Sequence, residues 1–288
     1  MLNHTLVEAS FPEFEITSPP IGSGGDKVVY RAKDNGSDFA LKVMSWDFPD
    51  EDDAGEMSPM ATTLERFDRE ISAMRVVSCP HVATVTHGPD TRQIGATKHL
   101  WFGEPYLNQG TLHDVRNGGQ LHPDAVTNLA KALLTAVAAM WNTEEGLVHR
   151  DIKPRNIGYV NGEVVLTDLG AVLFTDMSPL TSPSLAGPGT AEYASPEQFA
   201  PRRDTVLDFR SDLFQVGIVL VESLTGSHPF SGRAPDYFTA LTSFDASTLD
   251  PYPCSDELKT LIGRLLKERP AERFRTPELA LRMLEEGF

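Results

Sequence analysis

The sequence feature that most constrains this chain of 288 residues is a charged string near its middle. Residues 149–156 read HRDIKPRN, and residues 168–170 read DLG. Asp151 can accept a proton from a hydroxyl group, and Lys153 can neutralise a phosphate. Asn156 and Asp168 carry the hard oxygen atoms that Mg²⁺ prefers. Because a phosphoryl group in transfer spreads negative charge over its oxygens, these groups together suit phosphoryl transfer.

The order of the expected secondary-structure elements predicts the fold class. The first part of the chain reads mostly as short strands, and the rest reads mostly as helices, which favours an α+β protein with two lobes. Strands around a glycine-rich turn are expected over residues 15–43, a strand followed by a linker over residues 94–107, and a hairpin turning at Asn161 and Gly162 over residues 158–167. Helices are expected over residues 63–77, 123–142, 207–225, 255–267 and 277–286.

Composition and charge exclude several classes of protein. The net charge of −16 argues against a nucleic-acid partner, because binding to phosphate backbones is driven by cationic side chains. No apolar run reaches eighteen residues, so no membrane span is expected. The N-terminus lacks a signal-peptide pattern, and we expect a cytoplasmic protein. Cys79 and Cys254 are expected to be reduced packing residues, since a disulfide framework needs more cysteines.

The string at residues 149–156 and the triplet at residues 168–170 resemble the catalytic loop and metal-binding triplet of the protein kinase family, with Leu169 replacing the usual Phe. The resemblance covers about residues 12–286. It implies a two-lobed protein kinase fold with a small β-rich N-lobe that carries one main helix, and a larger, mostly helical C-lobe. The implied boundaries are about residues 12–105 for the N-lobe and 106–288 for the C-lobe, after an N-terminal extension of residues 1–11.

The resemblance also assigns roles to single residues. Asp151 would accept the proton of the substrate hydroxyl, and Lys153 would contact the γ-phosphate of ATP. Asn156 and Asp168 would hold Mg²⁺, with Mn²⁺ as an alternative metal. Thr190 would bridge Asp151 and Lys153, which is a feature of serine/threonine kinases.

Four further residues are expected to have structural roles. His149 is interpreted as a structural residue and not as a base. Asp212 would hold the backbone of the catalytic loop from its helix. Glu197 and Arg273 would form a buried ion pair that braces the larger lobe.

The N-lobe of the family binds ATP. Residues 21–30 read IGSGGDKVVY and resemble the glycine-rich loop over the phosphates. Lys42 would pair with the α- and β-phosphates, and Glu70, preferred over Glu65, would anchor that lysine. The candidate nucleotide-binding residues are Ile21, Gly22, Gly24, Val29, Ala40, Lys42, Glu70, Pro105 and Leu107.

Besides Leu169, three residues depart from the family pattern. Lys27 replaces the third glycine of the loop, where it either narrows the conformations of the loop or adds a positive charge near phosphate. The resemblance places Glu104 at the back of the adenine pocket, where a buried carboxylate needs a partner. A match of this segment to the family that is shifted by one residue is an equally good alternative. Gly158 lacks the apolar side chain that the family usually places beneath adenine, and Ile157 or Tyr159 would have to supply this contact instead.

Residues 189–197 read GTAEYASPE and resemble the end of a kinase activation segment, which small-molecule kinases of related fold lack. The resemblance is closest to bacterial eukaryotic-like kinases. It implies a serine/threonine protein kinase that transfers the γ-phosphoryl group of ATP to protein hydroxyls. The alternative is a non-catalytic, kinase-like scaffold or nucleotide-binding module.

The activation segment contains hydroxyl groups among prolines. Its middle is either a polar loop or a site of autophosphorylation. In the second case, self-association would bring two copies together, and Arg150 would bind the phosphate added to the segment. The candidate acceptors are Ser178, Thr181, Ser182 and Ser184.

Overall fold

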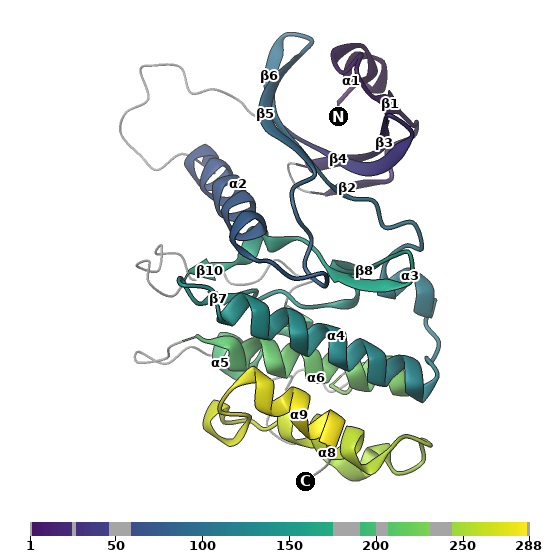
Figure 1. Cartoon of the computed structure of the whole chain (residues 1–288), viewed down its shortest axis with the longest axis vertical. Helices are drawn as coiled ribbons and strands as arrows, with labels where there is room; N and C mark the ends of the chain where they lie inside the picture. The colour runs from purple at the N-terminus through teal and green to yellow at the C-terminus, as the bar shows by residue number, and fades with distance from the viewer. Residues whose placement is uncertain are drawn as a thin grey trace. The chain divides into compact units, whose positions relative to one another are not determined.

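A computed structural model of the chain divides into two compact units (Figure 1). The structure describes residues 2–24, 27–45, 59–174, 191–199, 207–230 and 244–286, except for the side chains of residues 45, 59–63, 65, 66 and 191. The first unit comprises Met1–Val76 and Ala83–Asn108, and the second comprises Val77–Val82 and Gln109–Phe288. Each unit is described by itself.

The first unit is built on an antiparallel sheet. Along the sheet the strands are β1 (Glu15–Ile16), β3 (Lys27–Asp34), β4 (Ser37–Ser45), β6 (Thr97–Pro105) and β5 (His87–Ile94), and β2 (Gly22–Gly24) also pairs with β3. The strands predicted over residues 15–43 and 94–107 are confirmed. The sequence does not predict β5, because its residues HGPDTRQI are polar and lack apolar alternation. This strand lies at the edge of the sheet, where polar strands are tolerated.

Helix α2 (Pro59–Val76) covers one face of this sheet. Its buried residues Phe67, Ile71 and Met74 have the helical spacing that predicts a helix over residues 63–77, and the observed helix starts four residues earlier. The rings of Phe67 and Phe102 meet edge to face, with centroids 5.8 Å apart. Helix α2 therefore packs on the face of β6 to which Phe102 points.

The opposite face of the sheet is covered by the N-terminal segment. Helix α1 (His4–Ser10) contacts β5, and Phe11, which follows it, is fully buried. The ring of Phe11 lies edge to face against Trp101, at 5.2 Å, and Trp101 points away from its neighbour Phe102 because side chains alternate along a strand. The expected N-terminal extension thus contains a helix that belongs to the first unit, since so short a helix gains its stability from tertiary packing.

Truncating Phe11 to Ala is expected to lower the free energy of unfolding by about 3–5 kcal/mol, because it removes a buried aromatic ring and leaves a cavity. Urea denaturation of the whole chain checks this value. Leu6→Ala, at an exposed position of the same helix, is the matched control and should cost less than about 0.5 kcal/mol. A loss for Phe11→Ala as small as that expected for Leu6→Ala would mean that the ring of Phe11 does not contribute to the core.

The second unit is mostly helical. Among the residues that the structure describes, its main helices are α4 (Pro123–Trp141), α6 (Phe209–Thr225), α8 (Asp256–Leu265) and α9 (Pro277–Glu286), which pack against one another (Figure 1). The sequence predicts all four within a few residues of their ends. It does not predict two short helices, α3 (Leu112–Arg116) and α5 (Pro196–Phe199). Helix α6 ends at Gly226, which caps it in the left-handed conformation with φ 79°.

Short strands and 3₁₀ turns connect these helices. Strands β8 (Ile157–Val160) and β9 (Glu163–Leu166) form the predicted hairpin, and Asn161 and Gly162 both have the positive φ that its turn requires. A second pair is formed by β7 (Leu147–Val148) and β10 (Leu173–Phe174). The 3₁₀ turns are η1 (Pro154–Asn156), η2 (Leu169–Ala171), η3 (Ala191–Tyr193), η4 (Ala246–Leu249) and η5 (Pro270–Glu272).

The cysteines and the fold class agree with what the sequence predicts. Cys79 is buried and Cys254 is partly buried, and both are free thiols, as predicted. Among the residues that the structure describes, no helix is long and apolar enough to cross a bilayer. The strand-rich first unit and the helical second unit confirm the predicted α+β class.

Candidate active site

Asp212 of α6 holds the start of the loop at residues 149–156. Its Oδ2 atom accepts a hydrogen bond from the backbone N–H of His149, and its Oδ1 atom accepts one from that of Arg150, both at 2.8 Å. Burial raises the pKa of Asp212 to about 6, although His149 and the two backbone donors favour the ionised form. The predicted role of Asp212 in fixing the loop backbone is therefore confirmed.

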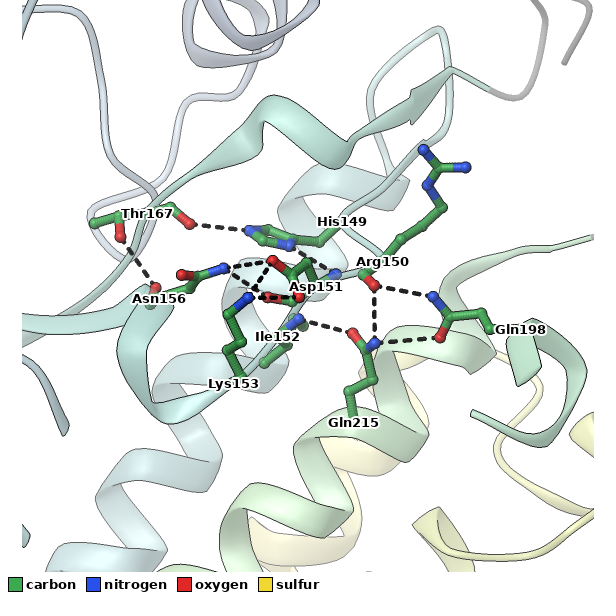
Figure 2. Close-up of polar contacts among 9 residues, drawn as sticks. All are labelled: His149, Arg150, Asp151, Ile152, Lys153, Asn156, Thr167, Gln198 and Gln215. Atoms are coloured by element: carbon green, nitrogen blue, oxygen red, sulfur yellow. Dashed lines mark hydrogen bonds and ion pairs between the residues drawn. The ribbon is translucent and has the colours of Figure 1, made fainter. Parts of the chain in front are cut away.

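The structure brings Asp151, Lys153 and Asn156 together (Figure 2). The Lys153 ammonium lies 3.0 Å from Oδ1 and 2.7 Å from Oδ2 of Asp151. The Asn156 side-chain nitrogen donates to the backbone carbonyl and to Oδ2 of Asp151, both at 2.9 Å. These donors fix the orientation of the Asp151 carboxylate.

His149 joins the loop to the segment after β9. Its Nδ1 accepts a hydrogen bond from the Asp151 backbone N–H at 3.2 Å, and its Nε2 lies 3.1 Å from the Thr167 carbonyl oxygen. Because Nδ1 accepts, the proton of a neutral ring belongs on Nε2, which donates to that carbonyl. The ring is fully buried, as expected of a structural residue.

Asn156 and Asp168 are held on neighbouring segments of the second unit. The Thr167 backbone N–H donates to the Asn156 carbonyl at 2.8 Å, and the Thr167 hydroxyl donates to the same oxygen at 3.2 Å. Asp168, the next residue, has a left-handed backbone with φ 60°. An amide oxygen and a carboxylate are ligands that fit Mg²⁺, which is usually held by one or two carboxylates together with substrate phosphates and water. Within the described residues, no cluster of three or more His, Cys, Asp or Glu side chains forms a metal site, so an ion here would need such additional oxygens.

Two glutamines that the sequence analysis missed also hold the loop (Figure 2). Gln215 of α6 accepts from the Ile152 backbone N–H at 2.8 Å and donates to the Arg150 carbonyl at 2.9 Å. Gln198 of α5 donates to the same carbonyl, also at 2.9 Å. The Gln215 amide thus bonds both peptide groups that flank Asp151. The signal for Gln215 in the sequence is an amide side chain within a largely apolar stretch, and its burial is shown only by the structure.

The predicted ion pair between Glu197 and Arg273 is present. The Arg273 guanidinium donates to both carboxylate oxygens of Glu197, at 2.6 and 2.9 Å, and Ser211 donates to Oε1 at 2.8 Å. Burial opposes ionisation of Glu197, but the bonds from Arg273 outweigh it and lower the pKa of this carboxyl below its usual value. The pair links α5 to the segment before α9.

The first unit contains a chain of four buried or partly buried charges. Lys42 of β4 lies 3.3 Å from Glu70 of α2 and 2.9 Å from Glu104 of β6. Lys27, at the start of β3, lies 2.7 Å from the second carboxylate oxygen of Glu70. Burial raises the pKa of Glu104, and Lys42 opposes that rise. Lys42 is therefore the partner that a carboxylate at this position was expected to need.

Strand register places two other candidate nucleotide-binding residues beside members of this chain of charges. Val29 is paired with Lys42 between β3 and β4, and Ala40 is paired with Glu104 between β4 and β6. Gly22 and Gly24 form the ends of β2, with the exposed Ile21 before it, and Pro105 ends β6 two residues before Leu107.

The remaining predicted residues lie in the second unit or outside the described part of the structure. Gly158 lies in β8 of the second unit, opposite Val165. The side chain of Glu65, the rival of Glu70, lies outside the described part of the structure, as do Thr190 and the candidate acceptors Ser178, Thr181, Ser182 and Ser184.

Comparison with known proteins identifies relatives of most of the chain. The family model described as protein kinase domain matches residues 16–283. The serine/threonine-protein kinase PknL of Mycobacterium tuberculosis is 36% identical over 217 residues, which cover 74% of this chain and 49% of that protein. The probable serine/threonine-protein kinase CPE1738 of Clostridium perfringens is 27% identical over 274 residues, which cover 92% of this chain and 37% of that protein. The chain thus spans about half the length of these curated relatives, or less.

Proposed function

The chain belongs to the protein kinase family, and from this membership we propose that it is a serine/threonine protein kinase that transfers the γ-phosphoryl group of ATP to protein hydroxyls. The observation that carries the proposal is the arrangement of Asp151 with Lys153 and Asn156. Their side chains meet through bonds of 2.7 to 3.0 Å. The names of the bacterial relatives support the choice of serine and threonine as acceptors.

In the proposed reaction, the Asp151 carboxylate takes the proton of the substrate hydroxyl. The hydroxyl oxygen forms a bond to the γ-phosphorus as the bond between that phosphorus and the bridging oxygen breaks, and ADP leaves with the electron pair. The Lys153 ammonium neutralises negative charge on the phosphoryl oxygens. General-base assistance of this kind is typically worth about 10² to 10⁴ in rate.

Asn156 and Asp168 would hold Mg²⁺, or Mn²⁺ in its place. The bound metal would neutralise charge on the phosphates. Lys42, anchored by Glu70, would contact the α- and β-phosphates of ATP. The adenosine would contact Ile21, Val29, Ala40, Pro105 and Leu107, and the phosphates would lie under the backbone of Gly22 and Gly24.

Autophosphorylation of the activation segment is the finer part of the proposal. The Arg150 guanidinium would bind the phosphate added to the segment. This group points away from Asp151, and its Nε donates to the Ala171 carbonyl at 2.6 Å (Figure 2). Thr190 would bridge Asp151 and Lys153. Self-association would bring one copy's segment to another's active site. A cytoplasmic location and the absence of nucleic-acid and membrane partners stay predictions from the sequence.

The proposal is tested by transfer of labelled phosphate from Mg²⁺-ATP to the protein itself and to a generic basic protein. We expect label on serine and threonine of both, complete loss of transfer when EDTA removes the metal, and modified residues between 175 and 190 by mass mapping. Nucleotide binding without any transfer would favour the non-catalytic scaffold. Transfer without phosphate between 175 and 190 would contradict only the autophosphorylation site.

A further inference from the structure

Lys27 lies on the same side of the sheet as Lys42. In the register of β3 and β4, Lys27 is opposite Met44 and Val29 is opposite Lys42. Directly opposite residues in an antiparallel pair share a face, and alternate residues along a strand share it too. Lys27 and Lys42 are therefore diagonal neighbours on one face, a separation that two long side chains can bridge.

Glu70 divides its carboxylate between these two lysines. Its Oε2 atom accepts from Lys27 at 2.7 Å, and its Oε1 atom accepts from Lys42 at 3.3 Å. Because one carboxylate fixes both ammonium groups, the two cations are held close together although they come from different strands. A fixed pair of cations is suited to an anion with several charges, such as a chain of phosphates.

The two lysines differ in how exposed their side chains are. Lys42 is shared with Glu104, 2.9 Å away, so two carboxylates compete with any incoming anion for its charge. Its side chain is 7% exposed, whereas that of Lys27 is 24% exposed. A phosphate can therefore reach the side chain of Lys27 more easily than that of Lys42, although both ammonium groups share the charge of Glu70.

Resting on the proposed use of ATP, we propose that Lys27 is a second phosphate-binding residue that carries part of the role assigned to Lys42. The glycine that the family has at this position has no side chain to contribute. Glu70 positions both ammonium groups, and Glu104 draws Lys42 toward the sheet. Lys27 contacts the β- and γ-phosphates, and its loss weakens the binding of di- and triphosphates more than that of AMP.

The test compares Lys27→Met, Lys27→Arg and the control Lys33→Met, which removes a lysine from the other end of β3. Calorimetric titration gives the affinity of each variant for AMP, ADP and ATP, and steady-state kinetics gives KM for ATP. A hydrogen bond to a charged group is worth about 1.5–3 kcal/mol, so Lys27→Met should weaken ATP binding about tenfold or more. AMP affinity should stay within about twofold, Lys27→Arg should restore most of the ATP affinity, and Lys33→Met should match the wild type.

Two outcomes would overturn the inference. Equal weakening of AMP, ADP and ATP by Lys27→Met would mean that Lys27 only shapes the loop, and unchanged ATP affinity would mean that it does not contact phosphate. The binding titrations do not depend on turnover. A wild-type protein that binds ATP but transfers no phosphate would refute the proposed function while still testing Lys27.

Discussion

Asp168→Asn is expected to reduce phosphate transfer from Mg²⁺-ATP by about a thousandfold. A bound metal ion supplies several kcal/mol of charge stabilisation in the transition state, and each 1.36 kcal/mol changes the rate about tenfold. Asn keeps the shape of the side chain but removes the negative charge that attracts the ion. The measurement is the initial rate of transfer over a range of Mg²⁺ concentrations, in which the variant should also need more metal.

The matched control for this prediction is Asp250→Asn, which makes the same chemical change at a side chain that is 71% exposed. It should transfer phosphate at the wild-type rate. Unfolding curves of all three proteins show whether they are equally folded. A rate for Asp168→Asn within about threefold of the wild type would contradict the assignment of Asp168 as a metal ligand.

Arg273→Met is expected to lower the free energy of unfolding by about 3–5 kcal/mol, because removing one partner leaves a buried carboxylate without its counter-charge. Arg273 also donates to the backbone carbonyls of Arg210, Lys267 and Glu268, and these bonds would be lost as well. Denaturant unfolding at neutral pH measures the change. Arg269→Met removes an arginine that is 79% exposed and 4.0 Å from its carboxylate partner, so it should cost less than about 1 kcal/mol.

The pH dependence of this effect has a definite sign. The pKa of Glu197 is lowered in the folded protein, so the pair stabilises the fold above the ordinary glutamate value of 4.5 and loses this effect as the pH falls through the folded value. The difference between wild type and Arg273→Met should therefore narrow as the pH is lowered below about 4.5. A difference that stays constant over this range would show that the loss comes from packing and not from the unpaired charge.

Regular patterns of apolar residues predicted much of the fold. Helices α2, α4 and α6 have long apolar faces, and the hairpin of β8 and β9 has a turn sequence that needs positive φ. Helix α1 and strand β5 lack such signals. A helix as short as α1 is unstable alone, and β5 is polar because it lies at an edge, so both depend on contacts with the rest of the first unit.

The residues of the catalytic loop were predictable because they are close together in the sequence. Asp151, Lys153 and Asn156 lie within six positions, so a single loop conformation brings their side chains into contact. The supporting contacts of Asp212 and of Glu197 with Arg273 join distant segments, and they were predicted only through the resemblance to a known family. Gln215 and Gln198, which local sequence did not single out, form equally close bonds to this loop.

The sequence by itself determined which reactive side chains lie close together in the loop at residues 149–156, because residue types at short spacing define which protons, phosphates and metal ions such a loop could bind. Tertiary structure alone decided how the charges of the first unit are shared. Lys27, Lys42, Glu70 and Glu104 lie on separate strands and on a helix, and strand register and helix packing bring them within 2.7 to 3.3 Å. The turn at Asn35 and Gly36 sets the register of β3 and β4 locally. The pairing of β4 with β6 and the packing of α2 join segments that are distant along the chain, so local sequence does not record them.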